Sequence, residues 1–199
     1  MNPPADAQAV LLDYFRRHLP GATAEELAAI GSLFEGRRLA RHEVLVRAGE
    51  VARVGAFVAR GCLRSFVVDE KGKEHIVQFA PENWWISDQN SLNRHEPAQF
   101  TIDAVEDSEV LLFDATFFRK LSQITPDFPE FFHRLLQNNV RTLQRRLVLT
   151  LSAPAEQRYV DFLQTYPTLA RRLPQRMIAS YLGVTPESLS RIRRELAGH

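Results

Sequence analysis

The 199-residue sequence has a single cysteine, Cys62, and no apolar run long enough to cross a membrane. One cysteine excludes an internal disulfide and an iron–sulfur cluster held by four thiolates of one chain. Because Cys62 follows Gly61 at an expected strand start, we predict a small buried residue rather than a redox centre. The first residues lack a basic region followed by an apolar stretch, so we expect no signal peptide and a cytoplasmic protein.

Histidines are few and scattered, and none of the six stands in an H-x-H or H-x₃-H spacing. A metal site on a β-roll would need two close histidines and a carboxylate, so the sequence disfavours a metalloenzyme. Neither a Ser-His-Asp set nor a Gly-rich phosphate loop stands out. We therefore expect no catalytic residues, no metal, no cofactor and no enzymatic activity.

Lysine is absent from residues 134–199, yet this third carries 11 arginines against 4 acidic residues, a net charge of +7. The remainder carries 14 basic and 20 acidic residues, so the net charge of the whole chain, +1, hides this asymmetry. A basic C-terminal third is the electrostatic signature of a DNA-binding module. The acidic remainder is not expected to touch phosphates.

The first two thirds predict an α+β fold. Helices are expected near 6–18 and 23–34, the second opening with a Thr23–Glu26 capping box. Short strands separated by turn residues then predict an antiparallel β-sandwich or jelly roll between about 36 and 114. The expected strands are 44–46, 56–58, 63–68, 76–79, 100–105 and 110–113, with a hairpin turn at Asp69–Gly72.

After a helix near 115–123, a long helix is expected from Thr125 to about residue 151. Its apolar side chains recur every three or four residues: Phe132, Leu136, Val140, Leu143, Leu147 and Leu151. This stripe favours a homodimer joined through residues 125–151. The alternative is that the flanking domains of the same chain cover the helix. A further helix is expected at about 154–165.

Two short amphipathic helices meet at Gly183, as in a helix-turn-helix. Thr185 is placed to cap the second helix, and Pro186 suits its first position because that N–H has no partner in a helix. At about 100° per residue, three apolar side chains share the inward face: Leu189, Ile192 and Leu196.

The opposite face carries Glu187, Ser190, Arg191 and Arg194, whose groups match the edges of bases in a major groove. The alternative is a merely solvated charged face. We assign base reading to Glu187, Ser190 and Arg191. We assign contacts with the DNA backbone to Thr185, Ser188, Arg176, Arg193 and Arg194.

A β-roll, a long helix and a helix-turn-helix, in this order, resemble the Crp/Fnr family of bacterial transcription regulators. Glu187-x-x-Ser190-Arg191 is similar to the Glu-x-x-Ser-Arg with which the Fnr-type branch reads a TGA-containing half-site. The resemblance implies that Arg191 contacts guanine, Glu187 a cytosine, and Ser190 a thymine or a phosphate. It also implies a homodimer on near-palindromic operators, and we expect RNA polymerase as a further partner.

The expected nucleotide pocket departs from the family pattern. Nucleotide-binding members carry a Gly-Glu pair and an Arg-Ser/Thr pair, where this chain has Ser87-Asp88 and Ala98-Gln99. Burying a phosphate without a guanidinium or a cradle of backbone amides is costly, so cyclic AMP is disfavoured. Arg94 would substitute only if its loop turned inward.

We place an effector pocket for an unidentified small molecule at Trp84, Trp85, Ser87, Asp88 and Gln99. The two tryptophans have an alternative role as core residues, which we favour. The family also has a β-hairpin wing beside the helix-turn-helix, for which residues 166–175 leave little room. Phosphate contacts are then expected from the helices themselves.

These patterns predict three parts: a sensor β-roll with N-terminal helices (1–124), a dimerisation helix (125–151) and a DNA-binding domain (152–199). The predicted function is a homodimeric regulator that binds promoter DNA, its activity set by an effector or by abundance. The alternative is a ligand-binding signalling module without DNA-binding activity.

Overall fold

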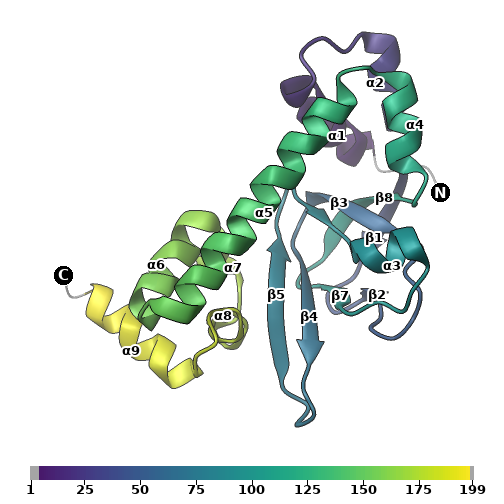
Figure 1. The fold of residues 1–199 in the computed structure, drawn as a ribbon. Coiled ribbons are helices and arrows are strands. Elements are labelled where there is room, and N and C mark those ends of the chain that lie inside the picture. The colour runs from purple at the N-terminus through teal and green to yellow at the C-terminus, as the bar shows by residue number, and fades with distance from the viewer. Residues whose placement is uncertain (1–4, 198–199) are drawn as a thin grey trace. The chain divides into compact units, whose positions relative to one another are not determined.

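The computed structural model describes residues 5–197, which form a β-roll, a long helix and a group of C-terminal helices (Figure 1). Contacts divide the chain into two compact units. The first unit holds the described residues up to 67 together with 78–134, and the second holds 68–77 together with the residues from 135 onward. The tip of one β-hairpin thus belongs with the C-terminal helices. Among the described residues, no helix is long and apolar enough to span a bilayer.

Two helices precede the sheets, α1 (Ala5–His18) and α2 (Ala24–Gly31). The predicted capping box is confirmed, since the Glu26 N–H donates to Thr23 Oγ1 at 3.2 Å and the Thr23 N–H donates to Glu26 Oε2 at 2.7 Å. Helix α2 ends earlier than expected, because the chain turns at Ser32 and enters a strand at Glu35.

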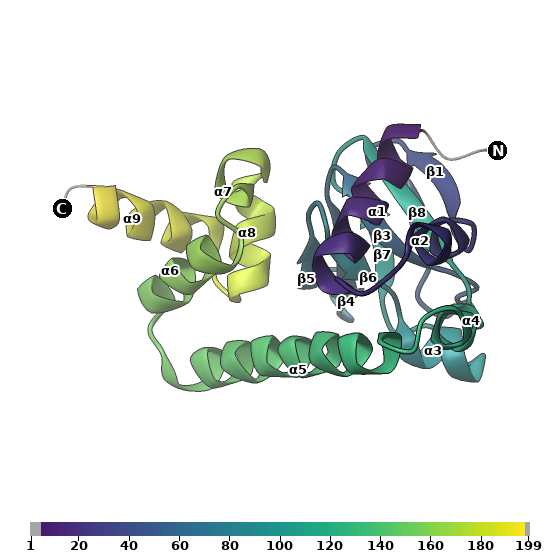
Figure 2. The same ribbon diagram turned by 90° about the horizontal axis from the view of Figure 1, so that it is seen from above.

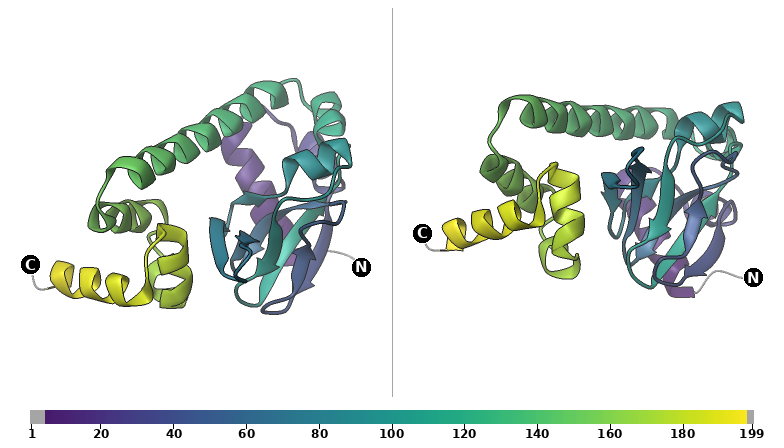
Figure 3. Two further views of the ribbon diagram at one scale, coloured as in Figure 1. Left: turned by 60° about the horizontal axis from the view of Figure 1, so that its bottom comes forward. Right: turned by 90° about the horizontal axis from the view of Figure 1, so that it is seen from below.

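The strands form two four-stranded antiparallel sheets, and the expected jelly-roll class is confirmed (Figure 3). One sheet has the order β1-β8-β3-β6 and the other the order β2-β7-β4-β5. The strands are β1 (Glu35–Leu39), β2 (Val44–Val46), β3 (Gly55–Arg60), β4 (Leu63–Val68), β5 (Glu74–Ala80), β6 (Trp85–Ile86), β7 (Thr101–Ala104) and β8 (Ser108–Phe113). Strands β1 and β6 and the short helix α3 (Gln89–Arg94) lie outside the predicted elements.

Aliphatic side chains from both sheets fill the interior of the roll. The buried cluster consists of Leu39, Val46, Ala52, Ala56, Val58, Leu63, Ala80, Ile86, Ala98, Ile102, Ala104, Val110 and Leu112. Cys62 is fully buried beside it, as predicted for a small core residue. The β4–β5 turn has the expected geometry, with Gly72 at a φ of +77° and its N–H donating to Asp69 O at 2.9 Å.

Aromatic side chains build a second core around Trp85. Its ring centroid lies 5.0–6.1 Å from those of six others: Tyr14, Phe15, Phe34, Phe57, Phe113 and Phe117. The Trp85 indole N–H donates to the Tyr14 hydroxyl at 3.1 Å. Aromatic pairs at this spacing stabilise a core beyond the area that they bury. They join α1, α4 (Phe117–Ile124) and three strands of the first sheet, β3, β6 and β8.

The long helix α5 (Phe128–Ser152) starts three residues later than predicted. Pro126 is the reason, because a proline disfavours helical geometry in the residue before it, and Thr125 is extended with φ −134° and ψ 128°. Four helices follow: α6 (Ala155–Thr165), α7 (Leu169–Arg172), α8 (Gln175–Leu182) and α9 (Pro186–Ala197) (Figure 2). Helix α7 was not among the predicted elements.

Candidate nucleic-acid interface

Helices α8 and α9 meet at Gly183, which adopts the left-handed conformation with φ +67° and ψ +36°. The Gly183 N–H bonds to carbonyls of the last turn of α8, and the Val184 N–H donates to Ala179 O at 3.0 Å. Glycine takes this conformation without the strain that a Cβ causes. The helix-turn-helix predicted from this residue is confirmed.

The start of α9 is fixed by Thr185. Its Oγ1 accepts the Ser188 N–H at 3.2 Å, and its carbonyl accepts the Leu189 N–H at 3.0 Å. Pro186 occupies the first helical position, as expected. These bonds satisfy donors that a helix start otherwise leaves open, so the first turn of α9 is fixed locally.

The inner stripe of α9 packs against α6 and α8. Leu189 and Ile192 are buried, and Leu196 is half-buried. The buried side chains of these two helices are mostly apolar: Tyr159 and Phe162 on α6, and Met177, Ile178, Ala179 and Leu182 on α8. Because this stripe faces inward, the opposite face of α9 must point to solvent.

The outward face of α9 brings together the predicted base-reading residues. Glu187, Arg191 and Arg194 are exposed, and Ser190 is half-buried at the edge of this face. The Arg191 side chain is 70% exposed, and its Nε lies 3.9 Å from a Glu195 carboxylate oxygen one helical turn away. Such an exposed pair is worth little, so the guanidinium can leave it for a base.

The carboxylate of Glu187 stays ionised at the start of this face. Hydrogen bonds from its own backbone N–H and from the Thr185 side chain lower the pKa of Glu187 below its ordinary value. An ionised carboxylate only accepts hydrogen bonds, which suits the amino group of cytosine. It also lies at the positive end of the helix dipole.

The residues predicted to contact the DNA backbone differ in their exposure to solvent. Arg176, in the first turn of α8, is exposed together with Thr185. Arg193 is half-buried beside the packing stripe of α9, on the flank of the outward face. Ser188 is half-buried too, and its hydroxyl oxygen lies 3.2 Å from Thr185 Oγ1.

The predicted effector pocket contains a buried carboxylate that is already bonded. Asp88 is 2% exposed and caps α3 by accepting the Ser91 N–H at 3.0 Å. Its other oxygen accepts the N–H groups of Gln99 at 2.7 Å and Phe100 at 3.2 Å. The backbone amides of Ser91, Gln99 and Phe100 are thus bonded to a carboxylate of the protein itself and are not open to a bound anion.

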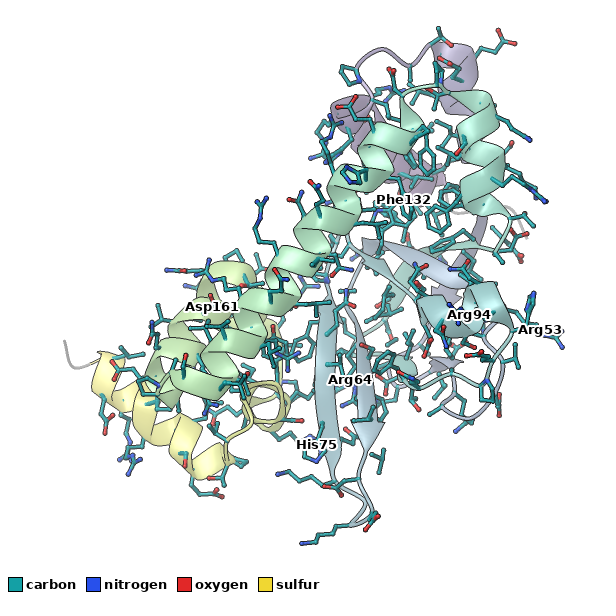
Figure 4. All side chains as sticks on the ribbon, viewed as in Figure 1. Arg53, Arg64, His75, Arg94, Phe132 and Asp161 are labelled. Atoms are coloured by element: carbon teal, nitrogen blue, oxygen red, sulfur yellow. The ribbon has the colours of Figure 1, made fainter. Side chains whose placement is uncertain are left out.

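The other predicted pocket residues do not gather around one space. Trp85 lies in the aromatic core and Trp84 packs against the aliphatic core, which favours the structural role for both. Gln99 is exposed. Arg94 is exposed at the end of α3, so it does not turn inward (Figure 4). Across residues 5–197, no three metal-ligating side chains stand together.

Comparison with known proteins gives the same architecture. Residues 36–124 match the cyclic nucleotide-binding domain family. The anaerobic regulatory protein of Pasteurella multocida is 24% identical over 183 residues, covering 84% of this chain and 65% of that relative's length. The transcriptional activator FnrA of Stutzerimonas stutzeri is 26% identical over 168 residues, covering 79% of this chain and 68% of the relative. FixK2 of Bradyrhizobium japonicum superposes with a TM-score of 0.70 at 20% identity, over 83% of this chain and 85% of FixK2.

The chain is thus similar in sequence to known regulators and shares the fold of FixK2, as the resemblance to the Crp/Fnr family implied. It departs from the family pattern in its C-terminal helices, where no strand occurs between residue 153 and residue 197. Helix α7 stands where a wing would follow α6, and it carries two arginines, Arg171 and Arg172. The sequence pattern correctly left no room for a hairpin here, but it did not predict the helix.

A buried ion pair in the β-roll was not predicted. Arg64 on β4 and Asp103 on β7 are each 5% exposed, and they pair through two hydrogen bonds. The signal in the sequence was a single charged residue in each of two largely apolar strands. This signal predicts an ion pair only when the register between β4 and β7, which places Arg64 opposite Asp103, is known.

Proposed function

We propose that this protein is a transcription regulator that binds duplex DNA as a homodimer, with α9 in the major groove. One observation carries the proposal: a helix anchored by a buried apolar stripe presents Glu187, Ser190 and Arg191 together to solvent. Arg donates to guanine, Glu accepts from cytosine, and Ser can do either. The names of the relatives, which describe regulators and an activator, support the same assignment.

Charge supports binding to the phosphate backbone. Three exposed arginines lie on the C-terminal helices, namely Arg171 on α7, Arg176 on α8 and Arg194 on α9. Each phosphate that they neutralise releases counterions, which makes the affinity depend on salt. Because no wing flanks α9 within the described residues, we assign the flanking phosphate contacts to these helices.

The surface of α5 supports the dimer. Six large apolar side chains along it are 41–77% exposed: Leu136, Val140, Leu143, Leu147, Val148 and Leu151. Most follow the alternating three- and four-residue spacing of a coiled-coil seam. A second copy of α5 would remove them from water, and it would place two copies of α9 in successive major grooves about 34 Å apart.

We assign the β-roll to regulation, through an effector that is not cyclic AMP. The Asp88 carboxylate already accepts three backbone N–H groups, and Ala98 and Gln99 offer no cation for a phosphate. A second anion beside Asp88 would meet both repulsion and a desolvation cost. RNA polymerase remains a predicted partner of the DNA-bound dimer.

Selection of binding sites from random duplexes tests the proposal. We expect a near-palindromic site with two half-sites one helical turn apart, bound with an affinity that falls steeply as salt rises. Light scattering of the same sample should give the mass of a dimer. A protein without salt-sensitive binding to any duplex would instead be a ligand-binding signalling module.

A further inference from the structure

We propose that Arg146 and Ser180 form a latch between strand β5 and helix α8, and that closing this latch raises the affinity for DNA. The inference deepens the proposed function and rests on it. All groups of the latch lie in one compact unit, which holds residues 68–77 and those from 135 onward. The latch therefore joins the β4–β5 hairpin to the first helix of the helix-turn-helix.

The Arg146 side chain is shared between the two elements. It projects from α5 and donates to the backbone carbonyls of Ile76 and Val77 on β5, the former at 2.9 Å. It also donates to Tyr181 O on α8 at 2.9 Å, while its guanidinium carbon lies 3.9 Å from the centroid of the Tyr181 ring. A guanidinium has five donors in a rigid plane, so one arginine can fix three carbonyls at once.

Ser180 adds two bonds to the same strand. Its hydroxyl accepts the Ile76 N–H at 3.1 Å and donates to Glu74 O at 2.7 Å. Strand β5 is the last strand of its sheet, so these groups are backbone positions that a further strand would otherwise pair. Helix α8 thus replaces a neighbouring strand along β5.

The latch also spans the bend between α5 and the DNA-binding helices. Arg146 precedes the break in the helix at 153–154, and Tyr181 follows it. The neighbouring Arg145 spans the same bend, but it pairs with Asp161 and Gln164 on α6, of which Asp161 is labelled in Figure 4. Only the second of these two arginines contacts both β5 and α8.

The position of Tyr181 explains why the latch should act on DNA binding. Its carbonyl belongs to the last turn of α8, two residues before Gly183, where the chain turns into α9. A cation at a helix C-terminus is favourable, and the bond to Tyr181 O holds that turn in place. Closure therefore orients α9, and any displacement of the β4–β5 hairpin is transmitted to it.

Hydrogen exchange of the Ile76 amide tests the contact in the free protein. We expect S180A, which removes two hydrogen bonds, and R146M, which removes three, each to accelerate this exchange by about tenfold or more. R145M is the matched control, because it removes the adjacent arginine without touching β5. Far-UV circular dichroism should show that all three variants keep their helices. If the Ile76 amide exchanges at the wild-type rate in both S180A and R146M, the proposed latch between β5 and α8 does not exist in solution.

The coupling to DNA has its own test. Linkage requires that the factor by which latch closure raises the affinity for DNA equals the factor by which bound DNA shifts the equilibrium between open and closed latch toward the closed state. We therefore expect a selected duplex to slow Ile76 exchange in the wild type and to leave it unchanged in R146M/S180A, with R146M binding that duplex more weakly. Equal or tighter binding by R146M would overturn the proposal. If the wild type binds no duplex, the proposed function fails, while exchange in the free protein still decides whether the latch exists.

Discussion

Arg64 and Asp103 stand opposite each other on β4 and β7 and form a bidentate ion pair, with Nε–Oδ1 at 2.8 Å and Nη2–Oδ2 at 3.0 Å. Leu63 belongs to the aliphatic core, and side chains alternate along a strand, so the pair lies on the other face of the sheet. The guanidinium also lies over the Phe66 ring, 4.2 Å from its centroid. The pair is buried on a face that carries no aliphatic core.

We expect R64M to lower the free energy of unfolding by about 3–5 kcal/mol, because it leaves the Asp103 carboxylate buried without its charge partner. The double variant R64M/D103L removes both charges and should regain much of the loss. R38M is the surface control, since the pair of Arg38 with Glu109 is exposed on the arginine side and should change stability by less than about 1 kcal/mol. Urea denaturation measures all three.

Two arginine variants should separate base reading from backbone binding. R191A should cost about 1–3 kcal/mol on the selected site and relax the preference at one base pair. R176A should weaken specific and random duplexes alike and reduce the slope of log affinity against log salt by about one. Fluorescence anisotropy over a salt series measures both effects. An equal loss of R191A on specific and random duplexes contradicts the role assigned to Arg191.

Substitutions at Gly183 should change the stability of the protein through backbone strain alone. A Cβ at this position would meet no atom within 4 Å, so any loss comes from the left-handed conformation. We expect G183A to cost about 1 kcal/mol of stability and G183N to cost less, because asparagine tolerates this conformation better. Thermal unfolding compares the two variants, and equal losses would indicate a packing defect instead.

Charges on the exposed stripe of α5 should disrupt the proposed dimer. We expect L143E/L147E to behave as a monomer in analytical ultracentrifugation and to lose affinity for a palindromic duplex, because two like charges would face two others across the seam. V160E is the matched control, since Val160 is an exposed valine on α6 outside the stripe. If the double variant remains a dimer, the exposed stripe of α5 is not the dimer interface.

The titration of Glu187 should depend on Thr185. Hydrogen bonds lower the folded-state pKa of Glu187 below 4.5, so their contribution to stability is present above that value and is lost as pH falls through the lowered pKa. In T185A we expect the pKa of Glu187 to move back toward 4.5, as followed by NMR of the side-chain carboxyl. An unchanged midpoint would show that the backbone N–H alone is responsible.

Elements with local signals could be predicted from the sequence. Gly183, Thr185 and Pro186 define the helix-turn-helix within four residues, and the Thr23–Glu26 box starts α2. Strand β1 was missed because only two of its five residues are buried, so its pairing with β8 makes it a strand. The start of α5 was predicted three residues too early, because the sequence did not show that Pro126 keeps Thr125 extended and delays the helix until Phe128.

Contacts between distant residues could not be predicted in the same way. The Arg64–Asp103 pair joins residues 39 positions apart, and it requires the register of two strands. The bond between Ile76 and Ser180 joins residues 104 positions apart. The outward face of α9 was predictable because one helix sets its geometry, whereas the contacts of Asp88 with Gln99 and Phe100 depend on how a loop closes.

The cover that α8 provides for strand β5 also protects against aggregation. Glu74 and Ile76 lie at the rim of a sheet, where open backbone groups can recruit a strand from another molecule. If α8 separates from β5, these groups become available to any extended chain nearby. Variants that separate the two elements should therefore form intermolecular β-structure at high protein concentration. We therefore expect the Ser180 hydroxyl, through its bonds to Ile76 and Glu74, to limit such pairing between molecules.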